Sequence, residues 1–136
     1  MSAFASSGYS RNSDSVAALK EAYKQAKVGL EGEAHTAWIM ASHHHADNLE
    51  QLEGKLPVKL VFGGTAYGAL TEHGESEEEP GFGLLLLSHP TLEFVSRRLP
   101  ADKESFDEVE WGRRIGKDLE DAAVAWLFLN LSLIHI

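Results

Sequence analysis

Three consecutive histidines, His43, His44 and His45, are the residues of this sequence best equipped for chemistry. Neutral imidazole binds zinc and other transition metals and exchanges protons near neutral pH. Adjacent histidines point in different directions, however, whereas zinc sites favour two ligands four residues apart on a helix. Asp47 lies four residues after His43, so a metal site is one interpretation of the segment. A polar turn that caps a helix or hydrogen-bonds a ligand is the second, and plain surface histidines are the third.

A glycine-rich segment, residues 63–68 (GGTAYG), is the second place where a ligand could be held. Glycines let a ligand approach the backbone, and successive N–H groups can cradle an anion. The segment lacks the Gly-Lys-Ser/Thr of a phosphate-binding loop, and its glycine spacing differs from the dinucleotide-binding pattern. It is therefore interpreted either as a tight turn after a strand or as a contribution to a ligand site.

Two serines, Ser6 and Ser7, are expected at the end of the first strand. Serine, histidine and aspartate all occur in the chain, so a hydrolytic triad can be imagined. The sequence contains no G-x-S-x-G nucleophile motif, which disfavours that chemistry.

Hydropathy patterns predict the elements that must position these residues. Asn12, Ser13 and Asp14 are residue types that favour a helix N-cap, and the helical spacing of apolar residues after them indicates a helix from Val16 to Leu30. A second helix is expected over residues 46–56. Short strands are expected over residues 3–9, 36–41 and 58–62. The order β-α-β-α-β favours a largely parallel sheet.

The second half of the sequence has a different pattern. The apolar runs at residues 82–88 and 92–99 indicate an antiparallel hairpin, and the acidic residues 72–80 indicate a solvated loop. A weak helical face is expected within residues 101–121, followed by an apolar strand at 122–129. The predicted fold class is thus α/β, a mixed sheet flanked by helices and incomplete at the C-terminus.

Parallel strands bring their carboxyl ends to one edge, and open α/β sheets bind ligands there. The sequence therefore predicts a small-molecule pocket where the first three strands end. Its candidate ligand-binding residues are Ser6, Ser7, Ser42, His43, His44, His45, Gly63, Gly64 and Thr65.

Composition narrows the class of protein. A length of 136 residues fits about one domain, and the net charge of −9 argues against nucleic-acid binding. The chain has no cysteine, which excludes disulfides and thiolate metal sites. It shows no secretory signal, and its apolar runs are far shorter than the roughly 18 residues of a membrane span. We expect a cytoplasmic protein with no membrane partner and no cofactor.

The last six residues, 131–136 (LSLIHI), match the translation of a transposase-end adapter used to prepare sequencing libraries. The match predicts that this tail is not biological and that the natural reading frame continues beyond Asn130. Residues 1–130 would then be the N-terminal part of a longer protein.

Several segments in order carry a family resemblance: AFASSGYS, AKVGLEG, HTAWIMASHHHADNLEQLEGKLP and LVFGGTAYGALTEHGESEEEPGFGLLLL. Over residues 3–99 the chain resembles the N-terminal FIST domain, an intracellular signal-transduction sensory domain of bacteria and some eukaryotes. Segments 42–49 and 63–68 match the family pattern by position. Many relatives have cysteine where this chain has Gly64, so a thiol role is absent here.

The resemblance implies a non-catalytic domain that senses small molecules such as amino acids. It also implies that a C-terminal FIST half follows in the complete protein. Two alternatives stay open: a metal-assisted or hydrolytic enzyme centred on His43–His45, and a module that serves only protein interaction.

Overall fold

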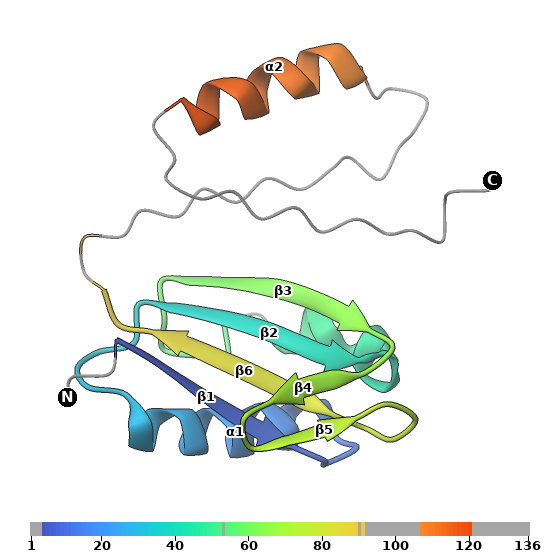
Figure 1. Ribbon diagram of the computed structural model, residues 1–136. Helices are drawn as coiled ribbons and strands as arrows, with labels where there is room; N and C mark the ends of the chain where they lie inside the picture. Colours follow the sequence, from blue (N-terminus) through green and yellow to red (C-terminus); the bar gives the residue numbers. More distant parts are fainter. Residues whose placement is uncertain (1–3, 53, 90, 92–106, 121–136) are drawn as a thin grey trace. The chain divides into compact units, whose positions relative to one another are not determined.

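The computed structural model describes residues 4–52, 54–89, 91 and 107–120, which belong to two compact units, residues 1–94 and 95–136. The first unit contains a four-stranded sheet in the order β1-β6-β2-β3 (Figure 1). Strand β2 pairs in parallel with β3, and β6 pairs antiparallel with both β1 and β2. The predicted α/β fold with a mixed sheet is confirmed. The strands are β1 (Ala5–Ser10), β2 (Thr36–Ser42), β3 (Leu60–Ala66) and β6 (Phe82–Leu87).

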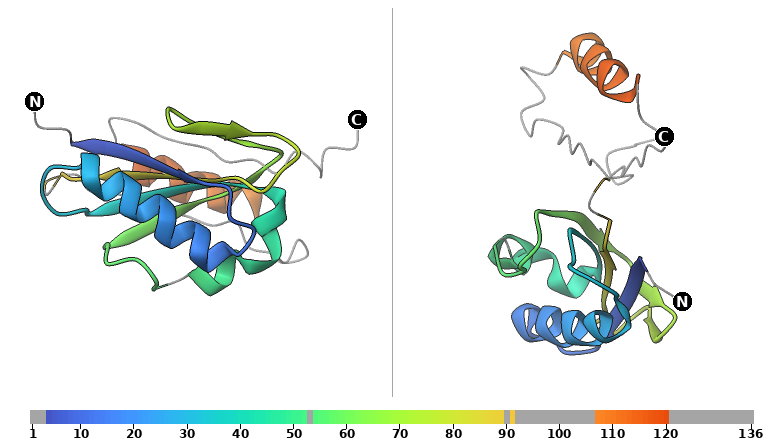
Figure 2. Two further views of the ribbon diagram at one scale, coloured as in Figure 1. Left: turned by 90° about the horizontal axis from the view of Figure 1, so that it is seen from below. Right: turned by 90° about the vertical axis from the view of Figure 1, so that its left-hand side faces the viewer.

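Two helices cover one face of this sheet (Figure 2). Helix α1 (Ser15–Gly29) begins after Asp14, whose carboxylate accepts a hydrogen bond from the Ala17 N–H at 2.7 Å. Of the three N-cap candidates in the sequence, Asp14 is the one that the structure selects, and it satisfies a donor that has no partner within the helix. Helix η1 (His43–Leu52), a 3-10 helix, follows β2 directly and contacts β2, β3 and α1.

The hydrophobic core lies between α1, η1 and this face of the sheet. Helix α1 and strand β1 approach very closely. A Cβ atom at Gly8 would lie only 1.9 Å from the carbonyl oxygen of Ala22. The absence of a side chain at Gly8, together with the small side chain of Ala22, allows the strand and the helix to pack backbone against backbone. The fully buried core residues include Ala18, Leu19, Ala22, Ala37, Ala41, Phe82, Leu84 and Leu86.

The opposite face of the sheet carries a hairpin of two short strands, β4 (Ala69–Thr71) and β5 (Gly74–Ser76) (Figure 2). The prediction of a loop over residues 72–80 is therefore wrong in part, since β5 lies within the acidic segment. Two glycines explain the site of the hairpin. A Cβ atom at Gly74 would lie 2.8 Å from the Tyr9 ring, and one at Gly81 would lie 1.7 Å from Ser76 Oγ, so these glycines make room for the Tyr9 ring and for the Ser76 side chain of β5.

Three predicted boundaries are wrong in a way that matters for the site. Strand β1 continues to Ser10, three residues past Ser7, although Ser6 and Ser7 were expected at its end. Strand β3 includes residues 63–65, which were expected in a turn. Helix η1 begins at His43, so the three histidines form its first turn and no separate polar turn precedes it.

In the second unit, helix α2 (Glu108–Leu119) lies within the segment where a helix was expected. The Asp107 side chain caps it by accepting hydrogen bonds from the N–H groups of Val109 and Glu110, both at 2.9 Å. The strands predicted at 92–99 and 122–129, and the tail 131–136, lie outside the described residues. Among the residues that are described, no helix is long and apolar enough to span a membrane.

Candidate functional site

The carboxyl ends of β2 and β3 lie side by side, as predicted for a ligand-binding edge. The parallel register pairs Met40 with Gly64, Ala41 with Thr65 and Ser42 with Ala66. Strand β1 runs in the same direction because both β1 and β2 are antiparallel to β6. The sheet therefore brings segments 42–44 and 64–66 together at one edge, where open α/β sheets commonly bind ligands.

The expected position of Ser6 and Ser7 at this edge is wrong. They pair with Leu86 and Leu85, near the carboxyl end of β6 and hence at the opposite end of β1. The strand extends past them because Tyr9 and Ser10 also pair with β6. Ser6 instead lines a shallow depression of about 500 Å³ beside the end of α1. Its other lining residues are Ala5, Gln25, Val28, Gly29, Glu72 and His73.

Ser42 is completely buried and fixes the end of β2 to the start of β6. Its N–H donates to the carbonyl oxygen of Gly81 at 2.8 Å, and the Gly81 N–H donates to Ser42 Oγ at 3.0 Å. Ser42 Oγ also lies 3.4 Å from Nδ1 of His44. This hydroxyl positions the neighbouring imidazole and is not itself exposed to a ligand.

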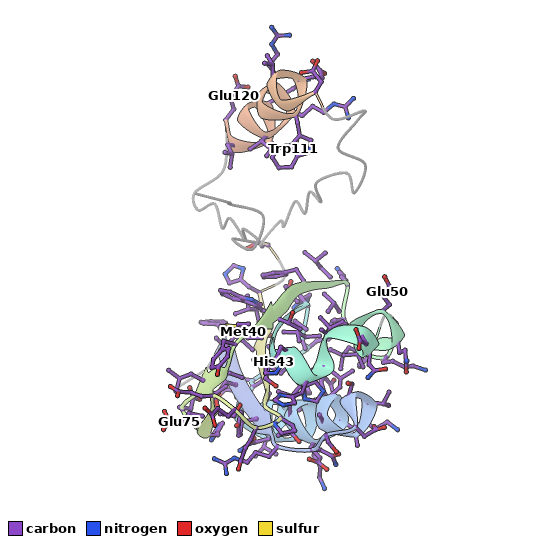
Figure 3. The ribbon with its side chains drawn as sticks, turned by 90° about the vertical axis from the view of Figure 1, so that its right-hand side faces the viewer. Met40, His43, Glu50, Glu75, Trp111 and Glu120 are labelled. Carbon is purple, nitrogen blue, oxygen red and sulfur yellow. The ribbon has the colours of Figure 1, made fainter. Side chains whose placement is uncertain are left out.

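His43 and His44 are both exposed, and their rings lie 4.1 Å apart between centroids. The His43 ring also stacks on Tyr67, with centroids 5.9 Å apart and an angle of 22° between the planes. Tyr67 is 68% exposed, so the faces of this cluster are open to solvent. Figure 3 shows His43 at the start of η1, away from Glu50, and Met40 on the adjoining strand. We call His43, His44 and Tyr67 the ring cluster.

His45 is a core residue, with no exposed surface. Its Nδ1 lies 2.9 Å from Ser15 Oγ, and its ring meets the Phe82 ring edge to face at 5.3 Å. Its Nε2 is buried and has no hydrogen-bond partner among the described residues. Burial lowers the pKa of His45, the charge of His44 lowers it further, and Asp14 opposes the shift. His45 is therefore held in its neutral form, because desolvation penalises the charged imidazolium.

The glycine-rich segment is divided between structural and exposed residues. Gly63 has φ +143°, and a Cβ atom there would lie 1.9 Å from the carbonyl oxygen of Ile39. It is required for the close approach of β3 to β2. A Cβ atom at Gly64 would meet nothing within 4 Å in the described structure, and Thr65 is exposed. Of the three ligand residues predicted in this segment, Gly64 and Thr65 are thus open to a ligand and Gly63 is structural.

The i, i+4 relationship of His43 and Asp47 does not align their side chains. A 3-10 helix has about three residues per turn, so positions i and i+3 lie on one face. Within the described part of the chain, no group of three or more His, Cys, Asp or Glu side chains is placed to hold a metal ion.

Three residues of the site were not identified from the sequence as site residues: Ser15, Tyr67 and Gly81. Ser15 follows the N-cap residue Asp14 in the chain, but its pairing with His45 requires tertiary packing. Tyr67 lies in the glycine-rich segment, where its aromatic character and exposure could have indicated a binding role. Gly81 precedes β6, and nothing in the pattern indicates that its backbone holds Ser42.

No family model, curated protein or solved structure compared with this chain matches it. The resemblance to the N-terminal FIST domain therefore stays a prediction, and the functional proposal depends on the residues themselves.

Proposed function

We propose that this chain is a non-catalytic, small-ligand sensing domain of a signal-transduction protein. The observation that carries the proposal is the parallel pairing of β2 with β3, which gathers His43, His44, Thr65 and Tyr67 at the carboxyl edge of the sheet. Two imidazoles and a hydroxyl at such an edge supply donors and acceptors for a polar ligand such as an amino acid.

The arrangement favours sensing because the same helix turn joins exposed and buried residues. His43 and His44 face solvent, whereas the next residue, His45, is fixed in the core through Ser15 and Phe82. A ligand that contacts the exposed imidazoles stabilises the first turn of η1 and thereby its packing on α1. A cytoplasmic location and a downstream C-terminal FIST half belong to the same proposal, since the resemblance implies both.

Thermal unfolding of the full chain with a panel of amino acids tests the proposal. A ligand that binds only the folded state should add about 2.7 kcal/mol of stability at 100 times its Kd. Replacing both His43 and His44 by alanine should abolish the gain. His73→Ala is the matched control, since His73 is an exposed histidine at the turn of the β4–β5 hairpin.

Absence of stabilisation by every member of the panel would contradict an amino-acid sensor and favour the protein-interaction alternative. Metal analysis of the purified chain addresses the enzyme alternative. Stoichiometric zinc that is lost in the His43/His44 double variant, but kept in His73→Ala, would overturn the proposal in favour of metal-assisted chemistry.

A further inference from the structure

The geometry points to a planar aromatic ligand that stacks on the His43 and Tyr67 rings and presents a hydrogen-bond acceptor at its ring edge. This inference rests on the proposed function and deepens it by naming the ligand class.

The His43 and Tyr67 rings are nearly parallel to each other. Their planes differ by 22° and their centroids lie 5.9 Å apart, within the 4.5–7 Å range typical of aromatic pairs. Tyr67 is 68% exposed and His43 is exposed as well, so their contact leaves much of the ring surface in water. A planar ligand would bury this surface, whereas a bulky aliphatic group could not lie flat on it.

The backbone that carries the rings is fixed on both sides. His43 follows Ser42, and Tyr67 follows Ala66, and these two residues are register partners at the end of the β2–β3 ladder. Ser42 is held to Gly81 by two hydrogen bonds. Each ring therefore stands one residue beyond a paired strand position, and a ligand loses little free energy in ordering the site.

The polar groups beside the rings determine where the acceptor lies. The His44 ring is 4.1 Å from the His43 ring and can donate an imidazole N–H, and the exposed Thr65 can donate its hydroxyl. His44 belongs to the ring cluster, and Thr65 precedes Tyr67 by two residues at the end of β3. A carboxylate or carbonyl attached to the ligand ring would thus accept hydrogen bonds while the ring stacks.

The experiment compares benzoate with cyclohexanecarboxylate by NMR titration of the isotopically labelled full chain. The two probes have the same charge and the same number of ring atoms, and only benzoate is planar and aromatic. We expect benzoate to bind with at least about fivefold lower Kd, corresponding to roughly 1 kcal/mol for one aromatic pair. We expect ring-current shifts on His43 and Tyr67.

Two variants separate stacking from general apolar contact. Tyr67→Leu should raise the Kd of benzoate about fivefold and leave that of cyclohexanecarboxylate unchanged. Tyr67→Phe should retain the affinity for benzoate, because its ring can stack in the same way. Because the Tyr67 side chain is exposed, we expect both variants to fold as the wild type does.

Equal affinity for the two carboxylates would overturn the stacking inference and leave the proposed function intact. Binding of neither probe, with no shifts at residues 42–44 or 65–67, would also overturn it. The amino-acid panel would then decide the proposed function separately.

Discussion

Ser15 and His45, separated by 30 positions in the sequence, join the first turn of α1 to the first turn of η1 through one buried contact of 2.9 Å. Solvent hardly reaches either side chain, since Ser15 is 4% and His45 0% exposed. The contact satisfies Nδ1 of the imidazole, while Nε2 has no partner in the described part of the chain. The start of η1, which carries the exposed histidines, thus depends on a polar pair inside the core.

Replacing Ser15 by alanine removes the hydrogen-bond partner of the His45 Nδ1 atom. We expect the free energy of unfolding to fall by about 1–3 kcal/mol, the usual cost of leaving a buried polar group unsatisfied. Urea denaturation measures the change. Ser13→Ala is the control, because Ser13 is exposed two residues earlier and should alter stability by less than about 0.5 kcal/mol. Equal effects of the two substitutions would show that the Ser15–His45 contact contributes nothing.

The lowered pKa of His45 makes stability depend on pH in a defined direction. In the unfolded chain its pKa is the ordinary value of about 6.5, so the unfolded state takes up a proton first as the pH falls. Above a pH of about 6.5, His45 is therefore neutral in both states and does not lower the free energy of unfolding. It decreases as the pH falls from there toward the folded-state pKa, with a slope of at most about 1.4 kcal/mol per pH unit.

Unfolding free energies measured between about pH 7.5 and pH 5 test this dependence on either side of the ordinary histidine pKa. His45→Gln lacks the titrating group, so its stability should fall less steeply with decreasing pH than that of the wild type. His73→Gln makes the same substitution at an exposed position and serves as the control for a histidine-to-glutamine change outside the core. If His45→Gln followed the wild-type curve at every pH, His45 would not be the residue that couples protonation to unfolding.

Gly63 and Gly64 are neighbours in β3 with opposite tolerance for a side chain. An alanine at position 63 would combine φ +143° with a Cβ atom 1.9 Å from a backbone oxygen of β2. We expect Gly63→Ala to destabilise the chain by roughly 2–5 kcal/mol, through backbone strain and overpacking together. Gly64→Ala meets nothing within 4 Å in the described structure and should change stability by less than about 1 kcal/mol. Thermal unfolding of both variants distinguishes them, and a tolerated Gly63→Ala would contradict the close approach of the strands.

Sequence patterns predicted the helix of α1, the apolar strands and the mixed α/β class because these depend on local periodicity. The group of N-cap types at residues 12–14 and the buried face of α1 follow from residue type and spacing alone, whereas the selection of Asp14 within that group does not. The predicted length of β3 was wrong because glycines at residues 63 and 64 indicate a turn, although here Gly63 serves the close pairing of two strands. How closely two strands approach each other depends on both strands, and the local sequence of one strand gives no information about its partner.

The candidate site was predicted only in part, because some of its residues are positioned by contacts between distant strands. Ser42, His43, His44 and Thr65 meet because β2 and β3 are consecutive parallel strands, which the β-α-β pattern indicates. Ser6 and Ser7 were misplaced because the end of β1 is determined by its pairing with β6, a strand distant in the sequence. The burial of His45 was not predictable either, since exposed and buried members of a histidine run differ only in their tertiary contacts.

Ser42 should link the stability of the fold to the geometry of the ring cluster. In Ser42→Ala the N–H of Gly81 loses its buried acceptor, while the bond from the N–H of residue 42 to the Gly81 carbonyl is backbone only and is retained. We expect a loss of about 1–3 kcal/mol in unfolding free energy and faster amide hydrogen exchange at Gly81. The rate of hydrogen exchange at the amide of residue 42 should increase only by the amount that follows from the lower global stability. Unchanged exchange at Gly81 would mean that the Ser42 hydroxyl does not hold the residue that leads into β6.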